Sequence, residues 1–286
     1  MKTYSKSIKT ITEYAQQVLQ NLYQPSETKF LIRMIFEHLA DYSYTDIIIH
    51  YNEPLEERLA TEAEKIIQRL AEHEPIQYIL GYEYFMGRKF MLDNSTLIPR
   101  PETEELVKAI IEECKETESN ILDIGTGSGC IAISLAKELP NAKVSACDIS
   151  PYALKMAKQN STALEAEVEF IECDILNIHK EFPLYNIIVS NPPYITEQEK
   201  IDMEDKVLLF EPSTALFVPN NEPLLFYTAI AKFGIKHLLP NGELWFEINR
   251  AFGEECCAML KEFGYQDIEL RKDIYGNNRI IKAIWR

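Results

Sequence analysis

The chain has 286 residues, of which 46% are hydrophobic and 26% charged, and these fractions exclude disordered, collagenous and coiled-coil proteins. Its formal net charge is −16 and no lysine- or arginine-rich run is present, which argues against a protein that binds duplex nucleic acid by neutralising phosphates. No apolar run approaches the roughly 18 residues that span a bilayer, and the first residues lack the apolar segment of a signal peptide. We therefore expect a soluble cytoplasmic protein that does not associate with membranes.

The cysteines and histidines give no sign of a disulfide framework or a metal site. No two cysteines have C-x-x-C spacing, and six are too few for a disulfide scaffold in a chain of this length. The five histidines are scattered and none has the i, i+4 spacing of a zinc site. We expect reduced thiols and no bound metal.

The first 81 residues predict a small helical domain. Apolar residues from Ile8 to Leu22 follow a 3.6-residue period, Ser26 can cap a second helix, and Pro54 can open a third. Residues 82–95 predict a linker in which the segment 82–92 forms a β-hairpin that turns near Gly87.

Residues 96–286 predict a separate α/β domain. A helix begins at Pro101, and further helices are expected at 131–139, 151–160, 223–239 and 254–263. Strands are expected at 121–124, 143–147, 168–172, 185–189, 243–248, 268–270 and 280–285. This alternation favours a Rossmann-like, mostly parallel, doubly wound sheet.

A glycine-rich loop stands between the first of these strands and the helix that follows. The sequence Leu122-Asp123-Ile124-Gly125-Thr126-Gly127-Ser128-Gly129-Cys130 lets the backbone approach a ligand closely, and the helix N-terminus offers free N–H donors. A tight strand-to-helix turn is the alternative interpretation. The dinucleotide fingerprint G-x-G-x-x-G fails because Cys130 occupies its last glycine position, which argues against a nicotinamide dehydrogenase.

Two acidic residues follow the next two strands. Asp148 ends the second strand, where a carboxylate can accept both hydroxyls of a ribose, although the same residue can simply cap the next helix. Asp174 follows the third strand and can reach an adenine amino group, or it can be an ordinary turn residue. Together with the glycine loop, Asp148 favours a nucleoside ligand.

The segment Ser190-Asn191-Pro192-Pro193-Tyr194 directly follows an apolar strand. Neither proline has an N–H group, so the nearby carbonyls are more readily left pointing outward. The Asn191 amide oxygen and such a carbonyl can accept the two hydrogens of a planar NH2 group, while the ring of Tyr194 packs on its plane. A proline turn with a core tyrosine is the alternative interpretation.

The glycine loop and the Asn-Pro-Pro-Tyr segment resemble those of class I S-adenosylmethionine-dependent methyltransferases that modify planar nitrogens. The resemblance implies that S-adenosyl-L-methionine is the cofactor and that S-adenosyl-L-homocysteine is the product. The implied cofactor-binding residues are Gly125, Thr126, Gly127, Ser128, Gly129, Asp148, Asp174, Ile175 and Asn191. The implied catalytic residues are Asn191, Pro192 and Tyr194.

Three further segments resemble the peptide chain release factor glutamine methyltransferases. They lie at 74–81, 97–105 and 210–216, and the resemblance runs from about residue 54 to the C-terminus. It implies methylation of the glutamine amide in the Gly-Gly-Gln motif of class I release factors. The implied substrate-binding residues are Asn191, Pro192, Pro193, Tyr194, Arg100 and Glu104. The chain departs from the family at Asn249-Arg250, where a glycine usually follows Glu247-Ile248.

Two other functions stay open at this point. Asn-Pro-Pro-Tyr also occurs in adenine-N6 nucleic-acid methyltransferases, but these need a basic cleft and contacts to a displaced strand, for which the acidic sequence gives no sign. A catalytically inactive, methyltransferase-like binding module is the other alternative, and the intact loop and Asn-Pro-Pro-Tyr segment argue against it. For Arg100 and Glu104, a helix start with solvated charges is the plain alternative.

Overall fold

The computed structural model describes residues 6–114 and 118–286, which form two compact units. The first unit contains the described residues up to Gly81 together with the short stretch Glu204–Phe210. The second unit contains Tyr82–Met203 and Glu211–Arg286, apart from the undescribed residues 115–117. No helix among the described residues is long and apolar enough to cross a membrane.

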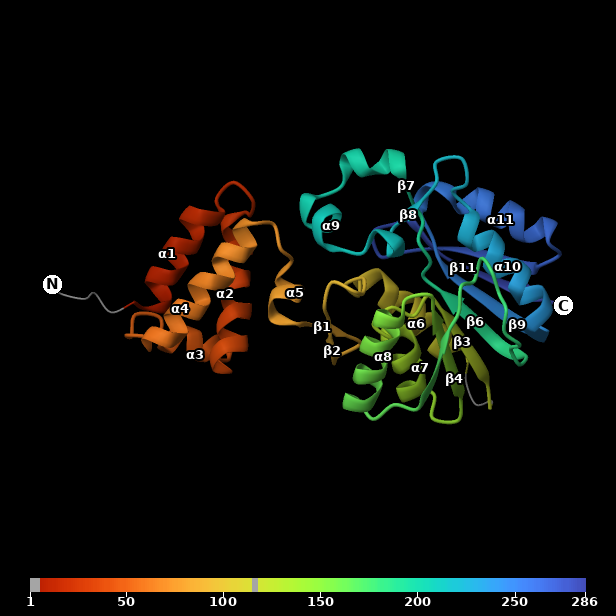
Figure 1. Ribbon diagram of the computed structural model, residues 1–286, viewed down its shortest axis with the longest axis horizontal. Helices are drawn as coiled ribbons and strands as arrows, with labels where there is room; N and C mark the ends of the chain where they lie inside the picture. Colours follow the sequence, from red (N-terminus) through yellow and green to blue (C-terminus); the bar gives the residue numbers. More distant parts are fainter. Residues whose placement is uncertain (1–5, 115–117) are drawn as a thin grey trace. The chain divides into compact units, whose positions relative to one another are not determined.

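The first unit is entirely helical in its described part (Figure 1). Its core forms because apolar residues repeat at helical spacing, as with Ile8, Ile11, Ala15 and Leu19, which are all buried. The helices are α1 (Ile8–Leu19), α2 (Pro25–Ala40), α3 (Tyr44–Ile49), α4 (Glu57–Ala71), α5 (Ile76–Leu80) and α9 (Asp205–Phe210).

Two of the predicted helix starts in this unit are wrong. Helix α2 begins at Pro25, whose ring presets a helical φ, so Ser26 lies inside the first turn instead of capping it. Helix α4 begins at Glu57, three residues after Pro54. The intervening Leu55 donates its N–H to the carbonyl of Lys6 at 2.8 Å, which holds this part of the chain against the start of α1 and delays the helix.

The second unit starts with the hairpin that the sequence predicts. Strands β1 (Tyr82–Phe85) and β2 (Arg88–Met91) pair antiparallel, and Gly87 at the turn has a φ of 72°. A positive φ is accessible to glycine without steric cost. The rings of Phe85 and Phe90 are buried with the helices on one face of the main sheet.

The main sheet has seven strands in the order β10-β11-β9-β6-β3-β4-β5 (Figure 1). The pairs among β9, β6, β3, β4 and β5 are parallel, and β10 and β11 extend the sheet antiparallel beyond β9. The expected α/β, mostly parallel, Rossmann-like sheet is thereby confirmed. The strands are β3 (Asn120–Ile124), β4 (Lys143–Asp148), β5 (Val168–Glu172), β6 (Tyr185–Ser190), β9 (Leu238–Glu247), β10 (Gln266–Lys272) and β11 (Asn278–Trp285).

Helices cover both faces of this sheet because alternate strand residues point to opposite faces. Ile121 packs in the cluster that contains residues of α6 (Pro101–Glu113) and α7 (Cys130–Glu138). Its neighbour Leu122 packs in the cluster formed with α10 (Leu225–His237) and α11 (Gly253–Glu262). Helix α8 (Pro151–Ala163) runs from the end of β4 toward β5. A short parallel pair, β7 (Ile195–Thr196) and β8 (Phe217–Val218), follows β6.

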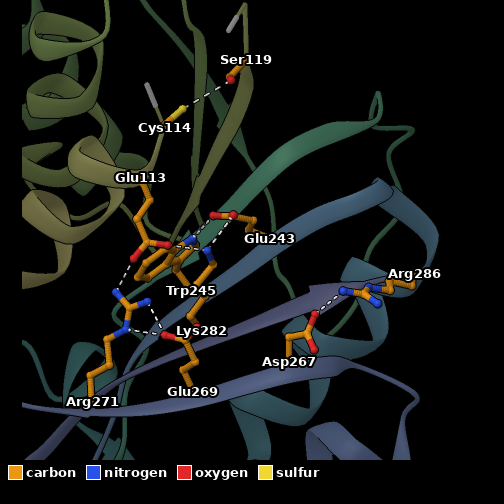
Figure 2. Close-up of polar contacts among 10 residues, drawn as sticks. All are labelled: Glu113, Cys114, Ser119, Glu243, Trp245, Asp267, Glu269, Arg271, Lys282 and Arg286. Atoms are coloured by element: carbon orange, nitrogen blue, oxygen red, sulfur yellow. Dashed lines mark hydrogen bonds and ion pairs between the residues drawn. The ribbon is translucent and has the colours of Figure 1, made fainter. Parts of the chain in front are cut away.

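A charged cluster covers the buried Trp245 near the antiparallel edge of the sheet (Figure 2). The Lys282 ammonium lies 2.5 Å from a Glu113 carboxylate oxygen and 2.8 Å from one of Glu243. Arg271 also pairs with Glu113, and both cations lie about 5 Å from the Trp245 ring. The cluster therefore joins α6 to strands β9, β10 and β11.

Replacing Lys282 with alanine is expected to lower the free energy of unfolding by about 2 kcal/mol. The side chain is 11% exposed, so its removal leaves two partly buried carboxylates close together without their shared cation. Urea unfolding followed by circular dichroism measures the change, with the exposed Lys272→Ala as the matched control. Equal midpoints for the two variants would show that the cluster contributes nothing to stability.

The six cysteines are free. Cys130, Cys147, Cys173 and Cys256 are buried, whereas Cys114 and Cys257 are partly exposed. Burial raises the pKa of the Cys256 and Cys147 thiols, so these groups stay protonated at neutral pH. The described residues contain no cluster of histidine, cysteine, aspartate or glutamate that could hold a metal ion.

Candidate active site

A cavity of about 370 Å³ opens at the carboxyl ends of β3, β4, β5 and β6, and all its lining residues belong to the second unit. This is the edge at which parallel α/β sheets bind ligands, and the volume lies within the usual range for small-molecule sites. Among the predicted site residues, eight line the cavity: Gly125, Gly127, Asp148, Asp174, Ile175, Asn191, Pro192 and Pro193.

The glycine loop supplies an open wall of the cavity. Gly125 and Gly127 have φ values of 76° and 56°, and a Cβ added to either would meet no protein atom within 4 Å. At Gly129, by contrast, a Cβ would lie 2.8 Å from the Ile133 side chain and 3.1 Å from Ala157. The first two glycines thus leave room for a ligand beside the loop, and the third lets α7 pack close to α8.

Asp148 holds the loop and still has capacity to bind a ligand. Its Oδ2 accepts the Gly127 N–H at 2.9 Å, and its Oδ1 accepts the Ser150 N–H at 2.9 Å. A carboxylate has about four acceptor positions, so these two bonds leave one on each oxygen for the two hydroxyls of a ribose. Ser150 caps α8 itself, because its side chain accepts the Ala153 N–H. Burial raises the pKa of Asp148, and the backbone N–H groups of Ser150, Gly127 and Ile149 partly offset this rise.

Three other residues of the predicted cofactor set are not among the residues that line the cavity. Thr126 is buried, and its hydroxyl donates to Asp123 Oδ2 at 2.6 Å. Ser128 is also buried, and Gly129 is the close-packing glycine described above. The roles assigned to the whole set stay predictions.

Asp123 is a fully buried carboxyl at the start of the loop. Burial raises its pKa to about 7. The hydrogen bonds from the Thr126 hydroxyl and the Ala132 N–H lower the pKa and so offset part of the effect of burial. The nearby Asp148 charge raises it further. Asp123 has no role predicted from the sequence, because its burial follows only from the packing of α7 over β3.

The raised pKa of Asp123 predicts a pH-dependent stability in the ligand-free protein. The folded state holds the proton more tightly than the unfolded state. The contribution of this group to the free energy of unfolding is therefore lost as pH rises from about 4 toward about 7. The stability of the wild type relative to Asp123→Asn should fall over this window by up to about 1.4 kcal/mol per pH unit. Urea unfolding of both proteins at several pH values tests this, and parallel curves would contradict it.

The Asn-Pro-Pro-Tyr segment follows β6, the strand next to β3, and its first three residues line the same cavity as the loop. Asn191, Pro192 and Pro193 line the cavity, and the Tyr194 hydroxyl donates to Glu247 Oε1 at 3.3 Å. The Ser190 hydroxyl donates to the Ile124 carbonyl at 2.6 Å, which joins the end of β6 to the end of β3. Burial raises the pKa of Tyr194, and the neighbouring Glu247 charge raises it further, so the hydroxyl stays protonated.

Asn249 occupies the position where the sequence departs from the family pattern, and it has a clear structural role. Its φ of −63° needs no glycine. Its amide Nδ2 donates to the Tyr194 carbonyl at 3.1 Å and to Glu199 at 3.0 Å, and its Oδ1 accepts the Ala251 N–H. The substitution therefore ties the chain that follows Asn191–Tyr194 to the end of β9.

The two predicted substrate residues outside this segment are engaged elsewhere. The Arg100 guanidinium pairs with the buried Glu211 at 2.5 Å, and Glu211 also accepts the Ile98 N–H. Glu104 accepts the Met86 N–H of the hairpin turn at 2.7 Å and pairs with Lys108. Neither Arg100 nor Glu104 is among the cavity-lining residues. Their contact with a substrate stays a prediction.

Sequence reasoning missed several cavity residues from distant segments. Ser95, Thr96 and Leu97 come from the chain before α6, and Phe226 and Ile230 come from α10. The apolar pattern of α10 indicates that the helix is buried. It does not indicate that the start of the helix lines a ligand cavity. Leu97 begins the segment 97–105, and only the resemblance to a known family indicated that this segment has a function.

Comparisons with known proteins agree with this geometry. The family model "Methyltransferase small domain" matches residues 102–216, and the model "PrmC N-terminal domain" matches residues 10–81. Among solved structures, a methyltransferase from Pyrococcus furiosus is 16% identical, with a TM-score of 0.50 over 76% of this chain and 96% of that chain. A 16S rRNA N2 G1207 methyltransferase from T. thermophilus, in complex with AdoMet and guanosine, is 16% identical, with a TM-score of 0.51 over 72% of this chain and 50% of that chain. The fold is that of the methyltransferases.

Relatives of known name narrow the family. A release factor glutamine methyltransferase from Bacteroides thetaiotaomicron is 47% identical over 274 residues, which cover 96% of this chain and 98% of the relative. A relative of the same name from Flavobacterium psychrophilum is 43% identical over 94% of this chain and 96% of its own length. Another from Lactococcus lactis is 40% identical over 95% of this chain and 98% of its own length. The chain belongs to the release factor glutamine methyltransferase family.

Proposed function

We propose that this protein transfers a methyl group from S-adenosyl-L-methionine to the side-chain amide nitrogen of the glutamine in the Gly-Gly-Gln motif of class I peptide chain release factors. The observation that carries the proposal is that Asn191 and Pro192 line the same cavity as the open glycine loop. The protein acts in the cytoplasm, and it neither inserts into membranes nor binds nucleic acid stably. The helical residues 1–81 form the substrate-recognition domain, the 82–95 hairpin is the linker, and 96–286 is the catalytic domain.

The cavity suits the proposed cofactor. The space beside Gly125 and Gly127 is free of protein atoms, and Asp148 has one acceptor position left on each oxygen for the ribose. Asp174 and Ile175 line the cavity at the end of β5, where an adenine ring can lie. S-adenosyl-L-methionine supplies an electrophilic sulfonium methyl group when bound.

The residues of the Asn-Pro-Pro-Tyr segment overcome the poor nucleophilicity of an amide. The nitrogen lone pair of a glutamine side chain is delocalised into the carbonyl. Asn191 Oδ1 and the Pro192 carbonyl each accept one amide hydrogen, which fixes the NH2 group with its lone-pair direction toward the cofactor side. Tyr194 supports the plane of the amide. Catalysis is then mainly positioning and electrostatic stabilisation of the charge that develops on nitrogen.

A methyl-transfer assay tests the proposal. Purified release factor, duplex DNA and single-stranded DNA are offered separately with radiolabelled S-adenosyl-L-methionine. We expect label on the release factor alone, and we expect it to disappear when the glutamine of the Gly-Gly-Gln motif is replaced. Label on DNA alone would assign the site to adenine, and no label with measurable cofactor binding would indicate an inactive binding module.

A further inference from the structure

A buried chain of hydrogen bonds lies behind Asn191. The Asn191 Nδ2 group donates to the Thr103 hydroxyl oxygen at 3.2 Å, and the Thr103 hydroxyl donates to Glu247 Oε2 at 2.5 Å. Thr103 lies in the first turn of α6 and Glu247 at the end of β9, and their exposed fractions are 2% and 1%. Neither residue lines the cavity, so both act on a ligand only through the residues in front of them.

The donor and acceptor capacities in this chain fix the direction of the Asn191 amide. A hydroxyl has a single hydrogen, and at Thr103 that hydrogen is used on the carboxylate of Glu247. The Thr103 oxygen is therefore left as an acceptor, and it can bind only the NH2 side of the Asn191 amide. The Asn191 Oδ1 atom then remains as the group that Asn191 presents to a ligand in the cavity.

The other oxygen of Glu247 acts on the far end of the same segment. Its Oε1 accepts the Tyr194 hydroxyl at 3.3 Å, so one carboxylate contacts Tyr194 directly and Asn191 through Thr103. A buried carboxylate is costly unless hydrogen-bonded, and both oxygens of Glu247 have a hydroxyl donor here. The arrangement therefore couples the orientation of the two side chains on either side of the prolines.

We propose that Thr103 and Glu247 are positioning residues that hold the Asn191 amide with its Oδ1 toward the substrate. The inference rests on the proposed function, because it assigns a purpose to the orientation of Asn191 in amide methylation. Without the Thr103 hydroxyl, the Asn191 amide is free to rotate by half a turn, which would place its NH2 group against the NH2 group of the substrate.

The variants Thr103→Val and Thr103→Ser separate positioning from packing. Valine keeps the shape of threonine and removes the hydroxyl, whereas serine keeps the hydroxyl. We expect Thr103→Val to lower kcat about tenfold or more, with the KM for release factor and the Kd for cofactor changed less than about threefold. Thr103→Ser should restore kcat to within about threefold of wild type. Thr162→Val, at an exposed threonine whose hydroxyl bonds its own helix, is the matched control.

A double-mutant cycle provides the decisive comparison. In the Asn191→Ala background, Thr103→Val should lower residual turnover less than about twofold, because the group that Thr103 positions is already gone. Full additivity of the two losses would overturn the inference, as would an unchanged kcat in Thr103→Val or equal losses in the valine and serine variants. If Thr103→Val does not fold, Thr103→Ala replaces it in the same cycle.

A spectroscopic measurement decides the inference independently of activity. The side-chain amide resonances of Asn191, identified by their absence in Asn191→Ala, should move in the ¹H–¹⁵N spectrum of Thr103→Val and stay near their wild-type positions in Thr103→Ser. Unchanged resonances in Thr103→Val would overturn the inference. If the wild type fails to methylate release factor, the proposed function is wrong, and the spectra still decide whether Thr103 orients Asn191.

Discussion

Replacing Asn191 with alanine is expected to lower turnover on release factor by about 100-fold or more, with cofactor affinity within a few fold of wild type. The substitution removes the side-chain acceptor that faces the cavity and leaves the glycine loop and Asp148 in place. The loss falls on kcat because the acceptor orients the nitrogen for reaction and contributes little to holding the cofactor.

Single-turnover kinetics with saturating cofactor, together with calorimetric titration of S-adenosyl-L-methionine, measure the two quantities separately. The exposed Asn141→Ala is the matched control, and its turnover should equal that of the wild type. An Asn191→Ala protein with turnover within a few fold of wild type would remove Asn191 from the acceptor role.

Replacing Asp148 with alanine is expected to weaken cofactor binding by about 100-fold or more. Hydrogen bonds to a charged group are worth about 1.5–3 kcal/mol each, so the loss of two ribose contacts gives a factor of this size. The variant also loses the acceptor that holds the Gly127 N–H, so the loop itself is less well positioned.

Calorimetric titration of the cofactor measures this loss, and turnover at saturating cofactor should recover to within about tenfold of wild type. The exposed Glu167→Ala, which removes an acidic side chain just before β5, serves as the control. A change in cofactor Kd of less than threefold in Asp148→Ala would show that the ribose lies elsewhere.

Local patterns were sufficient to predict most of the sheet and the hairpin. The strand at Val168–Glu172 matches its predicted bounds, and Gly87 lies at the predicted hairpin turn, because alternation and turn chemistry are encoded within a few neighbouring residues. The short helices α3 and α5 were not predicted, since five or six residues are too few to show a helical period. Tertiary hydrogen bonding of Leu55 likewise delays α4 in a way that no local pattern shows.

The candidate site also has one part that local sequence predicts and another part that it does not. The glycine loop and Asn-Pro-Pro-Tyr are contiguous in sequence, so their residue types and spacing indicate the chemistry directly. The partners that orient them are far away in the chain: Thr103 is 88 residues from Asn191 and 144 from Glu247, and Arg100 is 111 residues from Glu211. Only the folded sheet brings these pairs together, and a single sequence does not indicate which residues that far apart in the chain are in contact.

The pairing of β3 with β6 sets how the two halves of the site can change during evolution. Ile124 is in register with Ser190, and the Ser190 hydroxyl bonds the Ile124 carbonyl at 2.6 Å, so the loop and the Asn-Pro-Pro-Tyr segment leave adjacent strands at the same level. Their separation is set by the spacing of hydrogen-bonded neighbouring strands, which is about 4.8 Å. A descendant of this protein with a different methyl acceptor would therefore keep that separation and acquire its new specificity by exchanging side chains at the strand ends.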